Sequence, residues 1–255
     1  MKVRARLARW WDDVNLPIDA KRAMQRDRRG LAPADPGIER CVQEGIAWLG
    51  RAQDCSTSQD GGVSRDYSLI KGWATSYPET TGYIVPTMLA YGRSFHDNDA
   101  LTRARRMLDW LISIQLPNGA FQGGKIDASP VVPVTFNTGQ ILLGLAAGAS
   151  QWPDCVEPMQ RAAEWLVTTQ DPDGCWRQWP TPFAGPGEKV YETHVAWGLF
   201  EADRVSADRG YGIAGLKQVR WALTHQRPNG WLANCCLDNP AAPLTHTLGY
   251  ALRGI

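Results

Sequence analysis

Gln170-Asp-Pro-Asp-Gly174-Cys-Trp176 is the most informative phrase in this chain of 255 residues, because the chain repeats it. The pattern returns as Gln115-Leu-Pro-Asn-Gly119 and Gln226-Arg-Pro-Asn-Gly230, and a stretched copy runs from Gln53 through Asp60-Gly61-Gly62. The four glutamines are 62, 55 and 56 residues apart. Self-similarity at a fixed period of this size is the signature of a repeat architecture.

The residues around each phrase predict a helix that ends there. A tryptophan lies five positions before every glutamine, and apolar side chains recur at helical spacing in the same segments. The proline and the following Asn-Gly or Asp-Gly then stop the helix and turn the chain. The four tryptophans are Trp48, Trp110, Trp165 and Trp221.

A second repeat lies out of phase with the first. Its threonines are 57, 55 and 54 residues apart, and each precedes an apolar run. They are Thr81, Thr138, Thr193 and Thr247. Because Thr, or a neighbouring Glu or Asn, is a good N-cap, we expect a helix to start at each. These helices are apolar nearly all round, which is typical of buried helices.

The two interleaved repeats predict an all-α fold without a β-sheet beyond small hairpins. Each unit of about 55 residues contains an outer helix, a turn and loop, and an inner helix, and the chain holds about four such tandem helical hairpins. We expect residues 38–255 to form this repeat domain. Residues 1–37 are expected to form a separate basic N-terminal segment that is helical.

The phrase Gln170 to Trp176 resembles the QxxxGxW repeat of squalene and hopene cyclases, and the resemblance covers roughly residues 38–255. Gln115 to Phe121 matches with Phe in place of Trp. The resemblance implies an (α/α) toroid of inner and outer helices, related also to the prenyltransferases, with about six hairpins in a complete ring. The segments 61–64, 76–83 and 244–247 also look like a bacterial subgroup of toroid proteins that accompanies polysaccharide biosynthesis.

The chain ends at Ile255, eight residues past Thr247, so the sequence predicts an incomplete ring. A second copy of the chain covering the open edge, in a homodimer, is one expected consequence.

Charge and composition indicate which binding partners and which cellular compartment to expect for this protein. The net charge of +1 favours no nucleic-acid partner. The N-terminal segment lacks the apolar stretch of a secretory signal, and no run in the chain reaches the length of a membrane span. A cytoplasmic protein with six reduced cysteines is expected. The basic N-terminal segment is most typical of a helix that lies on the outside of the domain. A weak contact with a membrane surface through Trp10 and Trp11 is the alternative.

Polar residues gather where the inner helices are predicted to start. Each alone is more often a helix cap than a functional group, but their recurrence at one mouth favours a binding site. Helix N-termini and the loop residues Lys71, Lys125 and Lys189 would favour an anionic group there. The candidates are Glu79, Tyr83, Asn137, Gln140, Tyr191, Glu192, His194, Thr245, His246 and Tyr250.

This sequence lacks a convincing set of the residues that carry out catalysis in the cyclases and in the prenyltransferases. The Asp-x-Asp-Asp acid of the cyclases is absent, and the nearest string, Asp97-Asn98-Asp99, is followed by Ala100. A prenyltransferase zinc would need Asp, Cys and His ligands, as in Asp173 and Cys175, or in Cys235 and Cys236 with His246. Adjacent cysteines seldom bind one zinc together. We therefore predict no metal and no other cofactor, and keep zinc on Cys235, Cys236 and His246 as the alternative.

Acid–base chemistry on an acidic glycan, by a lyase or an epimerase, is the preferred hypothesis. His246 and His194 are the candidate acid or base, Tyr191 and Tyr250 the partner proton donors, and Asn137 the group that neutralises a carboxylate. Glu192 joins the catalytic set, and with Glu79 it could form the paired carboxylates of a glycosidase. Glu79, Tyr83, Asn137, Gln140 and Thr245 are the candidate substrate-binding residues. An isoprenoid cyclase or prenyltransferase, and a non-catalytic repeat scaffold, are the alternatives.

Overall fold

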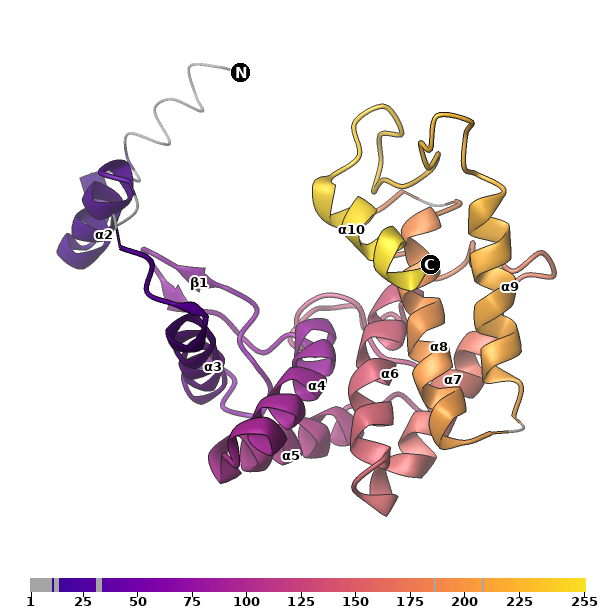
Figure 1. Cartoon of the computed structure of the whole chain (residues 1–255), viewed down its shortest axis with the longest axis horizontal. Helices are drawn as coiled ribbons and strands as arrows, with labels where there is room; N and C mark the ends of the chain where they lie inside the picture. Colours follow the sequence, from indigo (N-terminus) through magenta and orange to yellow (C-terminus); the bar gives the residue numbers. More distant parts are fainter. Residues whose placement is uncertain (1–10, 12–13, 31–33, 186, 208) are drawn as a thin grey trace.

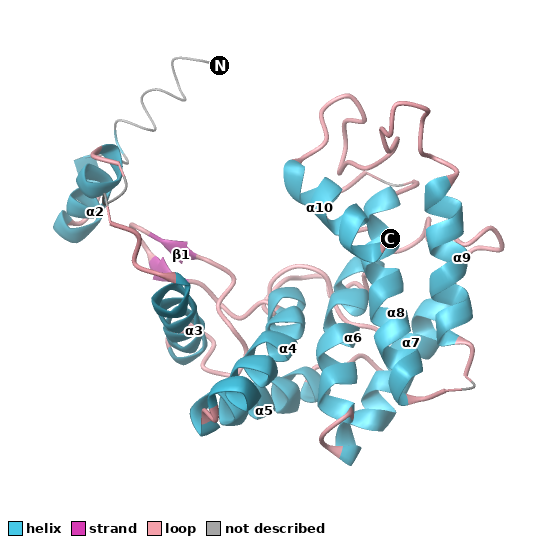
Figure 2. Ribbon diagram, viewed as in Figure 1, coloured by secondary structure: helices cyan, strands magenta, loops and turns pink. Residues whose placement is uncertain are grey.

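A computed structural model describes residues 11, 14–30, 34–185, 187–207 and 209–255. Outer and inner helices alternate along the chain (Figures 1 and 2). The outer helices are α3 (Ile38–Asp54), α5 (Asn98–Ser113), α7 (Val156–Thr169) and α9 (Tyr211–Leu223). The inner helices are α4 (Pro78–Phe95), α6 (Thr135–Ala149), α8 (Thr193–Val205) and α10 (Thr245–Gly254). The predicted all-α fold of four helical hairpins is therefore confirmed.

The remaining regular elements are short or lie outside the hairpins. Helix α2 (Ile18–Arg28) precedes the array, and the 3-10 turns η1 (Pro153–Cys155) and η2 (Val190–Glu192) lead into α7 and α8. Strands β1 (Tyr67–Ser68) and β2 (Gly72–Trp73) pair antiparallel in the loop after α3. Within the described residues this hairpin is the only sheet, as the repeats predict.

The repeated glutamines tie successive outer helices together. The side-chain Nε2 of Gln115 donates to Gly119 O at 2.9 Å within its own turn and to Pro158 O at 2.9 Å in α7. The Nε2 of Gln170 likewise donates to Gly174 O and to Ala214 O in α9, each at 3.0 Å. Each of these two glutamines thus satisfies one carbonyl of its turn and one of the next outer helix, which explains why the repeat carries Gln at these positions.

The repeated threonines are inside the inner helices rather than at their caps. Helices α4 and α6 begin three residues before Thr81 and Thr138, and neither has a side-chain N-cap bond. Thr138 Oγ1 instead accepts from Phe121 N at 3.0 Å and donates to Val134 O at 2.8 Å. The expected start positions are right within three residues, but the capping reason is wrong. Thr81 and Thr138 accept a bond from the preceding loop, and Thr193, the first residue of α8, donates to Ala251 O in α10.

Glycines let the inner helices pack closely in the order α4, α6, α8, α10. A Cβ added to Gly144 of α6 would lie 2.4 Å from the carbonyl oxygen of Gly82 in α4, and one added to Gly198 of α8 would lie 2.6 Å from that of Gly139 in α6. Only a residue without a side chain permits such an approach between backbones. These contacts bring the N-terminal ends of the inner helices to one side of the array.

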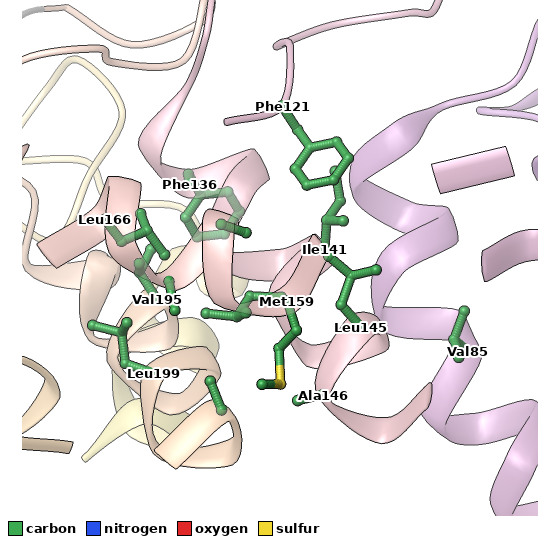
Figure 3. Close-up of a cluster of buried hydrophobic side chains, with 14 of the residues drawn as sticks. Val85, Phe121, Phe136, Ile141, Leu145, Ala146, Met159, Leu166, Val195 and Leu199 are labelled. Carbon is green, nitrogen blue, oxygen red and sulfur yellow. The ribbon is translucent and has the colours of Figure 1, made fainter. Parts of the chain in front are cut away.

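The core fills the space between the inner and outer helices. Figure 3 shows Phe136, Ile141 and Val195 of the inner helices beside Met159 and Leu166 of α7. Three tryptophans of the repeat are buried there, with 5% of Trp110 and 7% of both Trp165 and Trp221 exposed. Trp48 differs: it is 46% exposed and packs against Tyr67 and Trp73 of the β-hairpin.

The hairpins follow one another in an arc, with α3 at one end and α9 and α10 at the other (Figure 1). The N-terminal segment contains α2, whereas Trp10 lies outside the described residues, and Trp11 is 64% exposed. No helix in the described part of the chain combines the length and apolar character that crossing a membrane requires. The domain boundary, the membrane-surface contact and the homodimer stay predictions.

Candidate active site

A pocket of about 190 Å³ opens where the inner helices begin, and we call it the mouth pocket. Its walls come from the starts of α4, α6 and α10, from η2, and from the two loops that precede η2 and α10. It is lined by Tyr77, Glu79, Phe136, Thr181, Phe183, Tyr191, Leu237, His246, Thr247 and Tyr250.

Backbone and side-chain bonds hold the two loops in place. Thr135, the first residue of α6, donates its backbone N–H to Trp179 O at 3.0 Å, which fixes the loop that carries Thr181 and Phe183. The Lys189 ammonium donates to Leu237 O, and Val190 N donates to Asn234 O at 3.1 Å. Contacts between hairpins therefore help to hold both loops, and a local turn adds to them where Phe183 N donates to Thr181 Oγ1 at 3.1 Å.

Glu79 is the titratable group of the mouth pocket whose pKa lies nearest to neutral pH among those shifted by burial. Burial raises the pKa of its carboxyl to about 7, while the neighbouring Tyr77 hydroxyl and the Arg65 charge oppose that rise. The Arg65 guanidinium lies 5.8 Å from the Tyr77 ring centre. A carboxyl group whose pKa lies near neutral pH is suited to give and take protons.

The tyrosines around Glu79 remain protonated. Burial raises the pKa of Tyr77, Tyr191 and Tyr250 above the usual value, and nearby Glu79 adds to this effect in each. The Tyr191 hydroxyl is buried and forms no hydrogen bond among the described residues. Its ring meets that of Phe136 at 5.4 Å. Neutral hydroxyls of this kind act as hydrogen-bond donors rather than as bases.

His246 lies at the rim of the mouth pocket. Its side chain is exposed, and its ring packs 5.7 Å from that of Tyr250. Tyr250 in turn packs 5.1 Å from Phe136. The structure thus brings together four of the sequence candidates, namely Glu79, Tyr191, His246 and Tyr250.

Two candidates lie in a different cavity. Tyr83 and His194 line a larger cavity of about 750 Å³ between the inner helices, which we call the inner cavity, and Tyr250 lies on its boundary with the mouth pocket. Burial and the charge of Arg253 lower the pKa of His194 to about 4. His194 is neutral at physiological pH, and its ring packs 4.8 Å from Tyr250 and 5.2 Å from Trp197.

The other candidates do not line the mouth pocket. Asn137, Gln140 and Glu192 are buried, with at most 2% exposed. Burial holds the pKa of Glu192 well above the usual range, and nearby Lys189 opposes this. Glu192 therefore has no direct access to a substrate beside Glu79. Thr245 opens α10 and is exposed.

Several of these buried groups share an uncommon property. The amide of Gln140, both imidazole nitrogens of His194, the Asn137 Nδ2 and the Glu192 Oε2 have no hydrogen-bond partner in the described part of the protein. Unpaired buried polar atoms are few in native proteins and call for an explanation. Here these groups come from the first two turns of α6, from η2 and from the first turn of α8.

The zinc alternative finds little support in the arrangement of its residues. Cys235 and Cys236 are buried and the Cys235 thiol donates to Thr247 O at 3.3 Å, whereas His246 is exposed. Among the described residues, no three His, Cys, Asp or Glu side chains are grouped as a metal site requires. The absence of zinc and of other cofactors stays a prediction.

Six residues that line the mouth pocket were not among the site candidates from the sequence: Tyr77, Phe136, Thr181, Phe183, Leu237 and the repeat threonine Thr247. Tyr77 immediately precedes α4 and Phe136 lies beside Asn137, so both lie within the repeat register that singled out the other candidates. Nothing local marks Thr181, Phe183 or Leu237.

A scan against models of known protein families finds no match. Comparison with solved structures finds similar folds. A possible member of the GH105 family from Salmonella enterica superposes with a TM-score of 0.62 and 16% identity, over 84% of this chain and 63% of that one. An unsaturated glucuronyl hydrolase specific for heparin gives 0.59 and 16%, over 76% and 50%. A polysaccharide lyase gives 0.57 and 14%, over 70% and 59%.

These similarities support the toroid fold that the repeats predict. The chain spans between half and two thirds of the length of these three structures. Because the identities are low, the likeness concerns the fold, and function has to be argued from the site. The more specific resemblance to squalene cyclases and prenyltransferases has no counterpart in the names of these three structures.

Proposed function

We propose that this protein is an enzyme that modifies an acidic glycan, with the mouth pocket as its active site and Glu79 as its proton donor. The observation that carries the proposal is Glu79 itself, a carboxyl with a pKa of about 7 in a pocket lined by protonated tyrosines. The three similar folds support the proposal, because their names describe enzymes that act on glycans.

Hydrolysis of a glycosidic bond is the reaction that Glu79 supports most simply. The protonated carboxyl gives its proton to the glycosidic oxygen while the bond from that oxygen to the anomeric carbon breaks. Water then adds its hydroxyl group to the anomeric carbon and returns a proton to Glu79. Arg65 would attract a uronate carboxylate into the site, since its charge already acts on Glu79.

Elimination by a lyase is the second candidate, and the exposed His246 on the same pocket favours it. A neutral His246 would take the proton from the carbon next to the uronate carboxylate. That electron pair forms a double bond as the neighbouring carbon–oxygen bond breaks, and Glu79 protonates the departing oxygen. An epimerase would instead return a proton to the opposite face of the same carbon.

The size of the inner cavity is the observation that favours the isoprenoid alternative, although Glu201 and Arg204 line it beside apolar side chains. Leu143, Ala146 and Val205 line it, with Arg253 also on its wall. Binding of a farnesyl analogue there, without activity on any acidic glycan, would support this alternative. If the protein neither binds the farnesyl analogue nor acts on any acidic glycan, the alternative of a non-catalytic repeat scaffold would be supported.

A panel of uronate oligosaccharides tests the proposal directly. New reducing ends report hydrolysis, absorbance of an unsaturated product reports elimination, and exchange of the C5 proton reports epimerisation. Glu79→Gln should lower turnover by about 10²–10⁴-fold in either cleavage reaction, because the proton donor is lost. His246→Ala should abolish elimination and leave the fold intact.

Glu201→Gln is the matched control, because Glu201 is a carboxylate of the inner cavity, not the mouth pocket. Its turnover should stay close to wild type. Full activity in Glu79→Gln, or equal losses in both variants, would contradict the assignment of Glu79.

A further inference from the structure

A second pocket of about 390 Å³ adjoins the mouth pocket, and we call it the side pocket. The loop after α5 and Arg65 form most of it, and Phe183 lines both pockets. Phe183 is exposed, with 54% of its surface accessible to solvent. A chain-like ligand that fills the mouth pocket and continues past Phe183 enters the side pocket.

Arg65 stands at the junction of the two pockets. Its guanidinium lies 5.9 Å from the ring centre of Phe183 and 5.8 Å from that of Tyr77. The backbone is fixed, because Arg65 N donates to Thr75 O at 3.0 Å. Its only ion pair in the described residues is a 3.6 Å contact with the exposed Asp66. Such an exposed pair is weak and leaves the guanidinium able to bind another carboxylate.

Lys125 supplies a second cation to the side pocket. Its loop is held in place by Gln122 Nε2, which donates to Lys125 O at 2.8 Å, and by Ile126 N, which donates to Ser76 O at 3.2 Å. Among the described residues the Lys125 ammonium forms no salt bridge. Asp127 also lines the pocket, and Thr75 Oγ1 donates to its carboxylate at 3.2 Å.

We propose that the side pocket is a second sugar subsite, in which Arg65 and Lys125 bind the carboxylate of the uronate next to the one in the mouth pocket. The proposal rests on the proposed function and adds the substrate class: an acidic oligosaccharide of at least two sugar units. The exposed ring of Phe183 lies where the linkage between the two units passes. Arg65 contacts both units, and Lys125 only the second.

Binding measurements on the Glu79→Gln protein separate the two subsites without turnover. The probes are methyl glucuronide, a glucuronate dimer, and the neutral dimer cellobiose. Lys125→Gln should weaken binding of the glucuronate dimer by about tenfold, the loss expected for one hydrogen bond to a charged group. It should leave methyl glucuronide binding unchanged. Arg65→Gln should weaken the binding of both methyl glucuronide and the glucuronate dimer.

Lys217→Gln is the control, because Lys217 is an exposed lysine of α9 remote from the side pocket. It should change no affinity. Equal weakening of monomer and dimer by Lys125→Gln, no weakening of the dimer, or equal affinity for cellobiose would overturn the subsite. Turnover of acidic glycans that is indifferent to Lys125→Gln would overturn the subsite and leave the proposed function standing. Failure of every acidic glycan to bind would overturn both.

Discussion

Two sets of polar side chains recur with the hairpins, and their hydrogen bonding differs. At the ends of the outer helices, the amides of Gln53, Gln115 and Gln170 each donate two bonds to backbone carbonyls. At the starts of the inner helices, the amide of Gln140 and the imidazole of His194 have no partner in the described residues. An unpaired buried polar group costs stability, so the two repeats serve different purposes. The first holds the fold together, and the second lies at the inner-helix starts without lining the mouth pocket.

Gln218 is an exception to this contrast. It is fully buried in α9, an outer helix, and its amide also lacks a partner among the described residues. Nothing in the structure explains it.

The largest expected effect concerns the tryptophan that accompanies the bonded glutamines. Trp165→Ala should lower the free energy of unfolding by about 3–5 kcal/mol, because it empties a buried site. Urea unfolding measures this cost, and a binding assay on the same protein should show no selective loss of ligand affinity. Unchanged stability with lost binding would move Trp165 from the structural set to the functional one. Trp48→Ala is the control and should cost less, since Trp48 is 46% exposed.

The same substitution in the two sets of glutamines should have opposite effects. Gln53→Met leaves Gly61 O and Arg103 O without the Nε2 donor and should destabilise by about 2–4 kcal/mol. Gln140→Met replaces an unpaired buried amide with an apolar side chain of similar size and should leave stability unchanged or raise it by about 1 kcal/mol. Both values come from chemical denaturation. Losses of equal size in the two variants would remove the distinction on which the comparison rests.

A smaller effect is expected where the glycines set the spacing of the inner helices. Gly144→Ala should cost about 1–3 kcal/mol, because its Cβ would lie 2.4 Å from Gly82 O. Gly249→Ala in α10, with no atom within 4 Å of the added Cβ, should instead stabilise by about 0.5–1 kcal/mol. Thermal unfolding of the Gly144→Ala and Gly249→Ala proteins measures both effects. A stabilising Gly144→Ala would mean that α4 and α6 are not in close contact.

The smallest effect is a pH dependence of stability that Glu79 should produce. Its pKa is raised to about 7 in the folded protein, so the folded state holds the proton more tightly than the unfolded chain, whose value is 4.5. The associated stability is present below pH 4.5 and is lost as the pH rises through about 7. Relative to Glu79→Gln, the wild type should lose on the order of 1–2 kcal/mol across this range. A constant difference between the two proteins would show that Glu79 titrates normally.

The sequence predicted the fold better than the site, for physical reasons. The turn at Gln170 needs Pro and Gly in neighbouring positions, and those residues can be recognised locally. The close packing of Gly82 against Gly144 involves helices from different hairpins, so periodicity alone did not show it. For the same reason Thr138 resembled a cap, because its bond to Phe121 N depends on how the preceding loop folds back.

The residues that line the mouth pocket were anticipated mainly where they follow the repeat. Glu79, Tyr191, His246 and Tyr250 lie in register at the inner-helix starts and reach the mouth pocket. Phe183 and Leu237 come from irregular loops whose positions depend on contacts with other hairpins, such as the bond from Lys189 to Leu237 O. Arg65 acts on the site from the loop after α3, and no spacing rule connects it to Glu79.

Titration of the Glu79 carboxyl itself tests its role as proton donor without any substrate. Infrared difference spectra of the wild type against Glu79→Gln isolate the carbonyl band of its protonated form, and the band can be followed across the pH range. We expect a midpoint near pH 7, the value that burial beside Tyr77 and Arg65 gives this group. A midpoint near 4.5, the value of an ordinary glutamate, would contradict Glu79 as the proton donor of the mouth pocket.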